Sequence, residues 1–330
     1  MEAIILETSD VYRIDERLVQ SAFKELRSAQ RVLVVSHIRP DGDAVGSLIG
    51  LGLSLKDLGK DVQMVLSDGI PKIFRHLPGS DQVKNRPSGS FDMTLVVDCS
   101  DIERTGSSLN DSPFPDVNLD HHPTNTGFAR YNLVDEKAVA TSEILAEYLP
   151  KYDFPISKQV ADALLFGMIT DTLGFRTNNM TPKALHLAAQ LMEIGGDLPR
   201  LYQRGLLSRS FEAALYWGAG LSGLKRDGKL LWATLALKDR RAVGYPGNDD
   251  ADLISLLSTI EGADVAIMFV EQGNGHVKVS WRSQPQYDVS QVALNFGGGG
   301  HAAAAGASIK GDLSDTQANV LAITKSILEL

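Results

Sequence analysis

Residues 31–47, RVLVVSHIRPDGDAVGS, contain the transition around which the rest of the chain is organised. The β-branched apolar run at 32–35 predicts a buried strand, and the apolar stretch after Gly46 predicts a helix. The turn between them carries three side chains that can bind a metal ion: His37, Asp41 and Asp43. Open α/β sheets place their chemistry at the carboxyl ends of parallel strands. This stretch therefore predicts a metal site at the beginning of an α/β domain.

The same turn has a simpler interpretation, in which Asp43 is the N-cap of the following helix. Oxygen and imidazole ligands together suit Mn²⁺, Mg²⁺, Fe²⁺ or Zn²⁺. Three residues do not decide between a cap and a metal site. The metal interpretation requires further acidic and histidine residues at the ends of neighbouring strands.

The composition is that of a soluble globular protein, with 330 residues, 43% hydrophobic and 22% charged, and this length fits two domains better than one. The N-terminal stretch MEAIILETSDVYRIDER lacks the basic start and apolar core of a signal peptide. No apolar stretch approaches the length of a membrane span. The single cysteine, Cys99, excludes an intrachain disulfide framework and fits a reducing compartment. We therefore expect a cytoplasmic protein without a membrane partner.

The net charge of −9 bears on the kind of partner that the chain can bind. Proteins that bind long nucleic acids mainly through phosphates usually present a basic face, and this chain has no Lys/Arg-rich run. A polyanionic partner is therefore expected to be short and held by a few contacts. Long duplex nucleic acid is not an expected partner.

The hydrophobic pattern alternates between strands and helices in the first part of the chain and changes after about residue 220. Strands are expected at 32–35, 62–66, 93–97 and 117–119, and helices at 15–29, 44–58, 139–149 and 157–170. Such alternation predicts an α/β fold with a parallel sheet. From residue 221 the pattern predicts a smaller α+β domain. The expected organisation is an N-terminal domain of residues 1–195, a helical linker of 196–220 and a C-terminal domain of 221–330.

Further polar residues follow the later strands. Asp98 ends the third strand, where its carboxylate can bridge two ions or make an ordinary turn bond. Asp120, His121 and His122 end the fourth strand. An acid before two imidazoles allows one histidine to bind metal while the acid orients a ring, and the other histidine can face a substrate. Asp171 ends a largely apolar helix, where burial of its charge requires a cationic partner.

These residues, taken in order, resemble the motifs of the DHH phosphoesterase superfamily. The match comprises His37-x-x-x-Asp41-x-Asp43, Asp98, Asp120-His121-His122, Asp171 and the run FGGGGHAAAAG at 296–306. The last run resembles the DHH-associated C-terminal domain. Within the superfamily the chain is most similar to the bacterial nanoRNase and pAp phosphatase group. The resemblance implies a phosphoesterase that degrades RNA of about two to five nucleotides to 5′-mononucleotides and converts 3′-phosphoadenosine 5′-phosphate (pAp) to AMP.

The resemblance also implies two divalent metal ions, with Mn²⁺ favoured over Mg²⁺, Fe²⁺ or Co²⁺. One ion is expected on His37, Asp41 and Asp98. The other is expected on Asp43, Asp98, His121 and Asp171, so that Asp98 bridges the two. Asp120 would orient a histidine and His122 would lie near the scissile phosphate. Two ions about 3.5–4 Å apart lower the pKa of a shared water and stabilise transition-state charge.

Substrate-binding residues are expected mainly in the C-terminal domain. Gly298, Gly299 and Gly300 lie in a glycine run that can turn backbone N–H groups toward an anion. His301, expected at the start of a helix, adds a donor there. Arg282 and Arg104 are candidate phosphate clamps, and Ser142 can approach the metal site. The resemblance implies that the active site lies in a cleft between the domains.

Two other functions remain open on the sequence alone. One is a phosphodiesterase for cyclic or linear dinucleotides, of the c-di-AMP or pApA type. The other is a non-catalytic nucleotide sensor, against which the intact set of ligand residues argues. The expected partners are short oligoribonucleotides, pAp or dinucleotides. The sequence does not rank these substrates, and it leaves both a monomer and a homodimer open.

Overall fold

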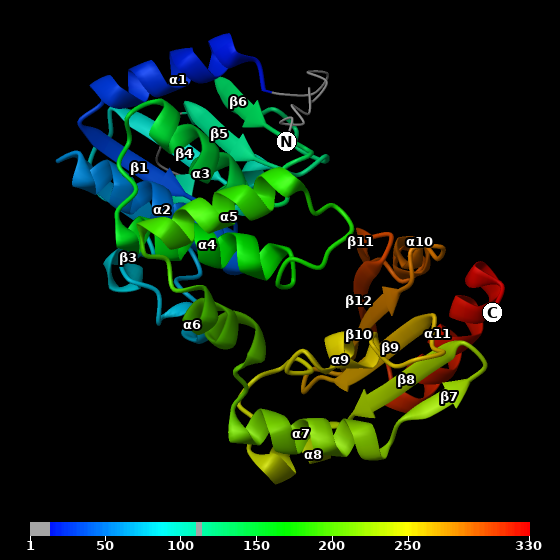
Figure 1. Cartoon of the computed structure of the whole chain (residues 1–330). Helices are drawn as coiled ribbons and strands as arrows, with labels where there is room; N and C mark the ends of the chain where they lie inside the picture. Colours follow the sequence, from blue (N-terminus) through cyan, green and yellow to red (C-terminus); the bar gives the residue numbers. More distant parts are fainter. Residues whose placement is uncertain (1–13, 110–113) are drawn as a thin grey trace, which may run out of the picture. The chain divides into compact units, whose positions relative to one another are not determined.

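A computed structural model describes residues 14–109 and 114–330 of the chain (Figure 1). The chain forms two compact units, Met1–Ser208 and Arg209–Leu330. The stretch 196–220 is shared between them. Helices α6 (Leu198–Tyr202) and η4 (Gln203–Leu207) belong to the first unit and α7 (Phe211–Ser222) to the second. Within the described ranges, each helix is too short or too polar to cross a membrane.

The first unit contains a six-stranded sheet in which every paired neighbour is parallel. Its strands are β1 (Arg31–Val35), β2 (Asp61–Val65), β3 (Val83–Lys84), β4 (Met93–Val97), β5 (Val117–Asp120) and β6 (Tyr131–Val134). Their order is β3-β2-β1-β4-β5-β6. The chain thus winds one way from β1 to β3 and the other way from β4 to β6. The point of reversal lies between β1 and β4, which is where open α/β sheets bind ligands.

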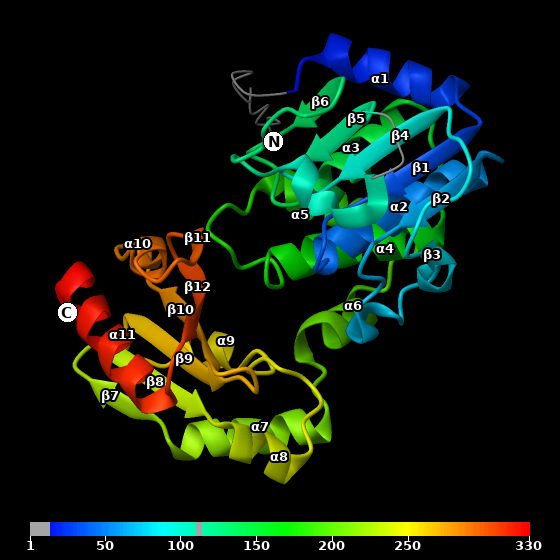
Figure 2. The same cartoon turned by 180° about the vertical axis from the view of Figure 1, so that it is seen from behind.

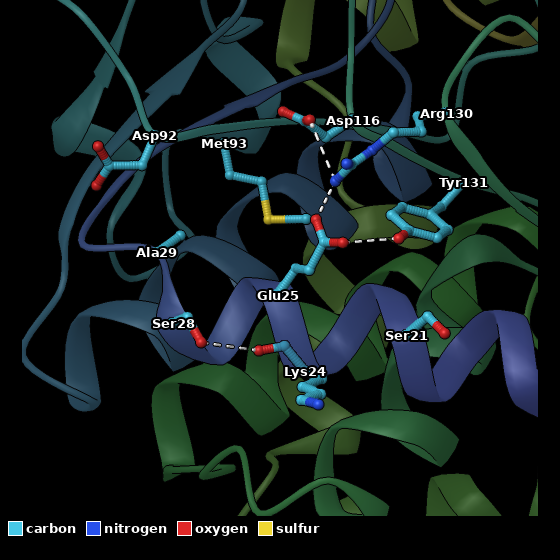
Figure 3. A pocket seen from close by; sticks show the side chains of 10 residues that line it. All are labelled: Ser21, Lys24, Glu25, Ser28, Ala29, Asp92, Met93, Asp116, Arg130 and Tyr131. Atoms are coloured by element: carbon cyan, nitrogen blue, oxygen red, sulfur yellow. Dashed lines mark hydrogen bonds and ion pairs between the residues drawn. The ribbon is translucent and has the colours of Figure 1, made fainter.

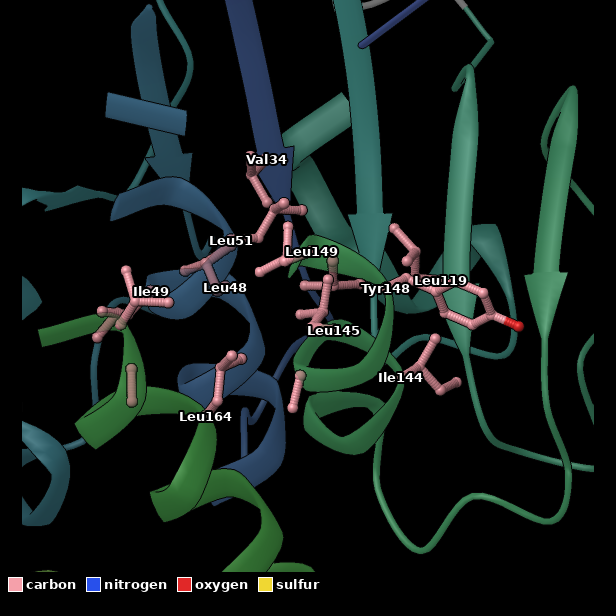
Figure 4. Close-up of a cluster of buried hydrophobic side chains, with 14 of the residues drawn as sticks. Val34, Leu48, Ile49, Leu51, Leu119, Ile144, Leu145, Tyr148, Leu149 and Leu164 are labelled. Atoms are coloured by element: carbon pink, nitrogen blue, oxygen red, sulfur yellow. The ribbon is translucent and has the colours of Figure 1, made fainter. Parts of the chain in front are cut away.

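The two faces of this sheet are covered differently. Helices α1 (Glu16–Ser28), α2 (Gly42–Asp57), α3 (Thr141–Lys151), α4 (Lys158–Asp171) and α5 (Pro182–Ile194) build the larger core with one face. Figure 4 shows part of that core, in which Val34 of β1 meets Leu48 of α2 and Leu145 of α3. The other face is covered by the segment after β4, which includes the 3₁₀ turns η3 (Ile102–Leu109) (Figure 2).

Helix α2 is buried on all sides, because every residue from Gly42 to Leu55 is buried. It lies between the sheet and α4, and glycines of both helices allow them to approach closely. A Cβ atom on Gly46 would lie 2.6 Å from the carbonyl oxygen of Ala163 in α4. A Cβ atom on Gly167 would lie 2.5 Å from Oδ1 of Asp43 and 2.0 Å from Oγ of Ser142. The close approach of these helices therefore sets the position of Asp43.

We predict that Gly46→Ala destabilises the protein, because the added methyl group meets backbone atoms that cannot move aside. The expected loss is about 1–3 kcal/mol in the free energy of unfolding, measured by urea denaturation of the metal-free protein. Gly218→Ala in α7 is the matched control, since its Cβ would have no neighbour within 4 Å. It should be neutral or stabilising by about 0.5–1 kcal/mol. Equal effects at both positions would contradict the packing argument.

The second unit contains a mixed six-stranded sheet in the order β11-β12-β10-β9-β8-β7. Its strands are β7 (Lys225–Asp227), β8 (Leu230–Leu235), β9 (Val265–Glu271), β10 (His276–Ser283), β11 (Gly299–His301) and β12 (Ala304–Lys310). Its further helices are α8 (Leu237–Val243), α9 (Leu253–Leu257), α10 (Val289–Leu294) and α11 (Leu313–Leu328). Helices α10 and α11 pack on one face of this sheet. Helices α7 and α9 pack on the other face, over β8 and β9.

The expectation of a helix beginning at His301 is wrong. Residues Gly299–His301 form β11, which pairs antiparallel with β12. The alanines predict a helix by propensity, but along β12 the residues Ala305 and Ala307 are buried while their neighbours are more exposed. This alternation has the period of a strand, and strand pairing outweighs the modest helical preference of alanine.

Candidate active site

The ends of β1 and β4, on either side of the reversal point, bring His37 and Asp98 together. Nε2 of His37 lies 3.7 Å from Oδ2 of Asp98, and Nε2 of His121 lies 3.7 Å from its Oδ1. Asp98 is almost fully buried and has a φ of +53°, a left-handed backbone conformation that is unfavourable for a non-glycine residue. The buried carboxylate thus lies between two imidazole rings that come from different strands.

Of the two aspartates that follow His37, the one that caps α2 is not the one expected. Asp41, and not Asp43, is the N-cap of α2, since its Oδ1 accepts the N–H of Ala44 at 3.0 Å. Its Oδ2 lies 3.9 Å from Nε2 of His37. The interpretation of Asp43 as N-cap is wrong because that residue lies inside the first turn. There its buried carboxylate accepts the N–H of Thr141 at 2.6 Å.

The ring orientations separate the three histidines into two kinds. Nδ1 of His37 donates to the carbonyl oxygen of Ile38 at 2.8 Å, and Nδ1 of His121 lies 3.3 Å from that of Ala138. In the neutral ring this leaves Nε2, which faces the cluster, without a proton and able to bind an ion. His122 differs because its Nδ1, and not its Nε2, faces Asp98 at 3.8 Å, and this nitrogen is already bonded to Oδ1 of Asp120 at 2.7 Å.

Asp120 is fully buried and connects His122 to a residue that sequence analysis missed. Nδ2 of Asn125 donates to Oδ2 of Asp120 at 2.6 Å and to Oδ1 of Asn118 at 2.7 Å. Both carboxylate oxygens of Asp120 are therefore occupied, which fixes the His122 ring. In a single sequence, Asn125 is simply a polar residue in a turn, and its spacing carries no recognisable signal.

Asp171, the last residue of α4, completes the cluster. Its Oδ2 lies 3.5 Å from Nε2 of His121. Burial raises the pKa of Asp171 to about 6, with the charges of Asp98 and Asp41 adding to the increase and His121 opposing it. The side chain of Asp171 is 30% exposed, and the cationic partner expected for this carboxylate stays a prediction.

Of the remaining expected residues in the first unit, Ser142 lies in the cluster. Its Oγ donates to Oδ1 of Asp43 at 2.5 Å. Arg104 lies on the segment after β4, and its carbonyl oxygen accepts the N–H of Ile38 at 2.6 Å. This bond connects the loops that follow β4 and β1. The guanidinium group of Arg104 donates to Oγ of Ser100 at 3.4 Å.

Arg282 and His301 lie on one face of the sheet in the second unit. Ala304 of β12 pairs with Arg282 of β10 on one side and with His301 of β11 on the other. Directly paired residues have their side chains on the same face, so these three form one row with the small alanine in the middle. A Cβ on Gly300 would lie 2.5 Å from the carbonyl oxygen of Ala304, and its φ is +146°. The hairpin thus requires glycine at positions 298 and 300, because a Cβ at either position would clash with the paired strand. A Cβ on Gly299 would meet no atom within 4 Å.

Comparison with known proteins now identifies the family. Residues 31–168 match the N-terminal domain of the DHH family, and residues 242–329 match the DHHA1 domain. The bifunctional oligoribonuclease and PAP phosphatase NrnA of Thermus thermophilus is 33% identical over 92% of both chains. The chain belongs to the DHH family of phosphoesterases. A protein of the same name from Mycoplasma genitalium is 27% identical over 90% of this chain and 95% of its own.

Solved structures confirm the fold of this DHH-family chain. An exopolyphosphatase-related protein from Bacteroides fragilis superposes with a TM-score of 0.87 over 98% of both chains, at 22% identity. RecJ from Thermus thermophilus in complex with Mn²⁺ gives a TM-score of 0.54 at 15% identity, covering 95% of this chain and 54% of RecJ. The expected α/β domain followed by a smaller α+β domain is therefore correct.

The donor set of this DHH-family chain fits divalent cations. Among residues 14–109 and 114–330, three groups have ligand atoms within 4.8 Å of one another, namely His37/Asp41/Asp98, Asp43/His121/Asp171 and Asp98/His121/His122. Burial and the charges of Asp98 and Asp171 raise the pKa of Asp43 well above its ordinary value. Carboxylates crowded in this way are relieved by a cation, and carboxylate with imidazole suits Mn²⁺ and similar ions.

A cavity of about 580 Å³ lies elsewhere on the first unit (Figure 3). It is lined by α1 and by residues at the start of β4 and β6, including Met93 and Tyr131. Glu25 forms an ion pair with Arg130 and accepts a hydrogen bond from Tyr131 at 2.7 Å. This cavity is at the amino ends of the strands, whereas the metal-ligand candidates are at the carboxyl ends. It is therefore separate from the candidate active site.

The pairing of His122 with Asp120 predicts a specific pH dependence of the metal-free protein. Burial alone would lower the pKa of His122, but the hydrogen bond to Asp120 and the charges of Asp98 and Asp171 outweigh it and raise the pKa to about 9. The proton on His122 therefore stabilises the fold below about pH 6.5, the ordinary histidine pKa, and this contribution is lost as the pH rises through 9.

In Asp120→Asn the pKa of His122 should fall toward 6.5, as measured by NMR titration of the ring protons. The loss of unfolding free energy between pH 6.5 and 9.5 should be smaller in this variant than in the wild type. Asp116→Asn, at the opposite end of β5, serves as the control and should behave as the wild type. An unchanged His122 titration in Asp120→Asn would show that this pair does not set the pKa.

Proposed function

We propose that this chain hydrolyses short oligoribonucleotides to 5′-mononucleotides and converts pAp to AMP and phosphate. The relatives that match nearly its whole length bear the names of those two activities. The main support for this proposal is the position of Asp98. Its buried carboxylate lies 3.7 Å from an imidazole nitrogen of His37 and 3.7 Å from one of His121. A single carboxylate in that position suits the bridging ligand of a two-ion phosphoesterase.

One site can serve both reactions because the same kind of bond breaks in each. In the oligonucleotide, water attacks a phosphodiester and the P–O3′ bond breaks, which leaves a 5′-phosphate on one product and a 3′-hydroxyl on the other. In pAp, water attacks the 3′-phosphate and the P–O3′ bond breaks again, which gives AMP and inorganic phosphate. The leaving group is a ribose 3′-oxygen in both cases and requires one proton.

We assign the metal ligands as expected from the sequence. His37, Asp41 and Asp98 would hold one ion, and Asp43, Asp98, His121 and Asp171 the other, with Mn²⁺ favoured. Bound ions at such a site supply Lewis-acid stabilisation and activate water. Asp98 is suited to bridging because it stays ionised. Burial opposes its ionisation, but His37, 3.7 Å away, and the charges that the histidines carry when protonated lower its pKa to about 2.

His122 is assigned the role of the proton donor. Its Nδ1 donates to Asp120, which stabilises the imidazolium form of the ring, and in that form Nε2 carries the proton that can be given away. A pKa of about 9 keeps this ring protonated at neutral pH in the metal-free protein. The acceptor is the phosphoryl group or the departing 3′-oxygen. Asp120 and Asn125 hold the ring in place throughout the reaction.

A substrate panel tests the proposed function. Purified protein with Mn²⁺ is incubated with pAp, a linear diribonucleotide, a five-nucleotide RNA, a cyclic dinucleotide and a long single-stranded RNA. The first three should be hydrolysed with 3′-hydroxyl products, and the long RNA should react much more slowly. Hydrolysis of the cyclic dinucleotide alone would replace the proposal with a cyclic-dinucleotide phosphodiesterase. No hydrolysis with two bound ions would favour a nucleotide sensor.

Asp98→Ala should abolish nearly all turnover, because both proposed ions lose a shared ligand. The expected reduction in kcat exceeds tenfold, which corresponds to about 1.4 kcal/mol of barrier. Asp61→Ala removes an exposed carboxylate from the same sheet and should keep the wild-type rate. Circular dichroism checks that both variants fold. A rate above a tenth of wild type in Asp98→Ala would remove the bridging role.

Arg282→Ala and His301→Ala should impair pAp and diribonucleotide hydrolysis more than hydrolysis of bis-p-nitrophenyl phosphate. Binding of a remote substrate group is expressed as positioning at the reacting phosphate, and the small ester lacks such a group. Arg241→Ala, on the exposed helix α8, is the control. The measurement is kcat/KM for each substrate. Equal proportional losses on all substrates would mean that the Arg282/His301 row does not bind substrate.

A further inference from the structure

The first turn of α3 has no side-chain cap of its own. Its N-cap residue is Ala140, whose side chain has no acceptor, so the first N–H groups of the helix need acceptors from elsewhere. Asp43 supplies them from α2. Its Oδ2 accepts the N–H of Thr141 at 2.6 Å, and its Oδ1 accepts the N–H of Ser142 at 3.1 Å. A proposed metal ligand is thus fixed by the start of a distant helix.

The two oxygens of Asp43 are used unequally. Oδ1 also accepts the hydroxyl groups of Ser142 at 2.5 Å and of Ser47 at 3.2 Å. With the N–H of Ser142, this oxygen has three donors and no remaining capacity, whereas Oδ2 has one donor. Oδ2 is therefore the oxygen of Asp43 that can bind an ion. The hydrogen bonds select which oxygen faces the metal site.

Thr141 also contacts a second proposed ligand. Its Oγ1 donates to Oδ1 of Asp98 at 3.0 Å, and the side chain of Thr141 is fully buried. The same residue thus holds Asp43 through its backbone N–H and Asp98 through its hydroxyl. Asp43 belongs to the group Asp43/His121/Asp171, whereas Asp98 belongs to His37/Asp41/Asp98 and to Asp98/His121/His122 and is proposed to serve both ions. A β-branched side chain has restricted rotation about χ1, so the hydroxyl has a fixed direction.

We propose that Thr141 is a positioning residue that couples the two ion sites by orienting Asp98 relative to Asp43. The inference rests on the proposed two-ion phosphoesterase. Removal of the hydroxyl lets the Asp98 carboxylate rotate, so that it no longer presents one oxygen to each ion. The backbone bond to Asp43 does not depend on the side chain. The two functions of Thr141 can therefore be separated by substitution.

Contacts made by the next two residues of α3 also fix the position of Thr141. Glu143 is fully buried, and one of its oxygens accepts the N–H of Val139 at 2.7 Å while the other lies 3.0 Å from Nζ of Lys183 in α5. Gly167 of α4 leaves the space that the Ser142 side chain occupies. The start of α3 is thus fixed before any ion binds, as a positioning role requires.

The test compares Thr141→Val with Thr141→Ser in the metal-free protein. Valine keeps the shape and the N–H but removes the hydroxyl, and serine keeps the hydroxyl. Mn²⁺ binding is followed by the electron paramagnetic resonance signal of free Mn²⁺, which does not depend on activity. We expect two bound ions in the wild type and in Thr141→Ser. Thr141→Val should bind at least one ion tenfold or more weakly, and its kcat should fall with little change in KM.

Thr324→Val is the matched control. Thr324 is fully buried in α11, and its hydroxyl accepts the N–H of Trp281, outside the metal site. This variant should lose thermal stability with and without Mn²⁺ but keep wild-type Mn²⁺ affinity. In Thr141→Val, by contrast, the increase in Tm on adding Mn²⁺ should shrink. A purely structural role for Thr141 would lower both Tm values and leave that increase unchanged.

A double-mutant cycle shows whether Thr141 acts through Asp98. In the Asp98→Ala background, Thr141→Val should cause no further loss of Mn²⁺ affinity. Wild-type Mn²⁺ affinity and kcat in Thr141→Val would overturn the proposal. If valine prevents folding, Thr141→Ser decides, because a tenfold loss of affinity there would show that the methyl group and not the hydroxyl matters. Absence of phosphoester hydrolysis in the wild type would reject the proposed function, while the binding curves would still decide the role of Thr141.

Discussion

The rest of the structure depends on the crowding of acidic groups at one edge of a parallel sheet. Asp98 lies among His37, His121 and His122, and the fully buried Asp43 accepts hydrogen bonds from α3. Like charges in a buried volume repel strongly unless a cation or several donors compensate them. Two features of the fold bring these acidic groups and histidines together. They are the glycine-lined contact of α2 with α4 and the reversal of strand order between β1 and β4.

Much of this edge could be predicted from the sequence, because a parallel sheet turns strand ends into neighbours. His37, Asp98 and Asp120 follow apolar runs of strand length, and the carboxyl ends of such strands meet. Asp171 could be predicted for a different reason, since an acid ending a buried helix requires a partner. Periodicity and the expense of burying charge place these residues, whereas their assignment to two metal ions follows from the resemblance to the DHH superfamily.

The remaining features depend on contacts that a single sequence does not reveal. Asn125 and Thr141 act through distant partners, and the need for Gly167 follows from the proximity of two helices. Strands β3 and β6 were missed because they are short and partly exposed. The alanines after His301 predict a helix, but the structure forms a hairpin there because pairing with β12 overrides their modest helical preference.

The first turn of α2 has a consequence for how ions enter and leave. Asp41 caps this helix and Asp43 lies inside its first turn, while Gly42 is packed so closely that an added Cβ would lie 2.2 Å from Oγ1 of Thr170. Release of Asp43 thus requires local opening of a buried helix start, which is slow compared with loop motion, whereas the side chain of Asp41 is 61% exposed and can move away alone. An ion held by Asp43 is therefore expected to exchange with solvent more slowly than an ion held by Asp41.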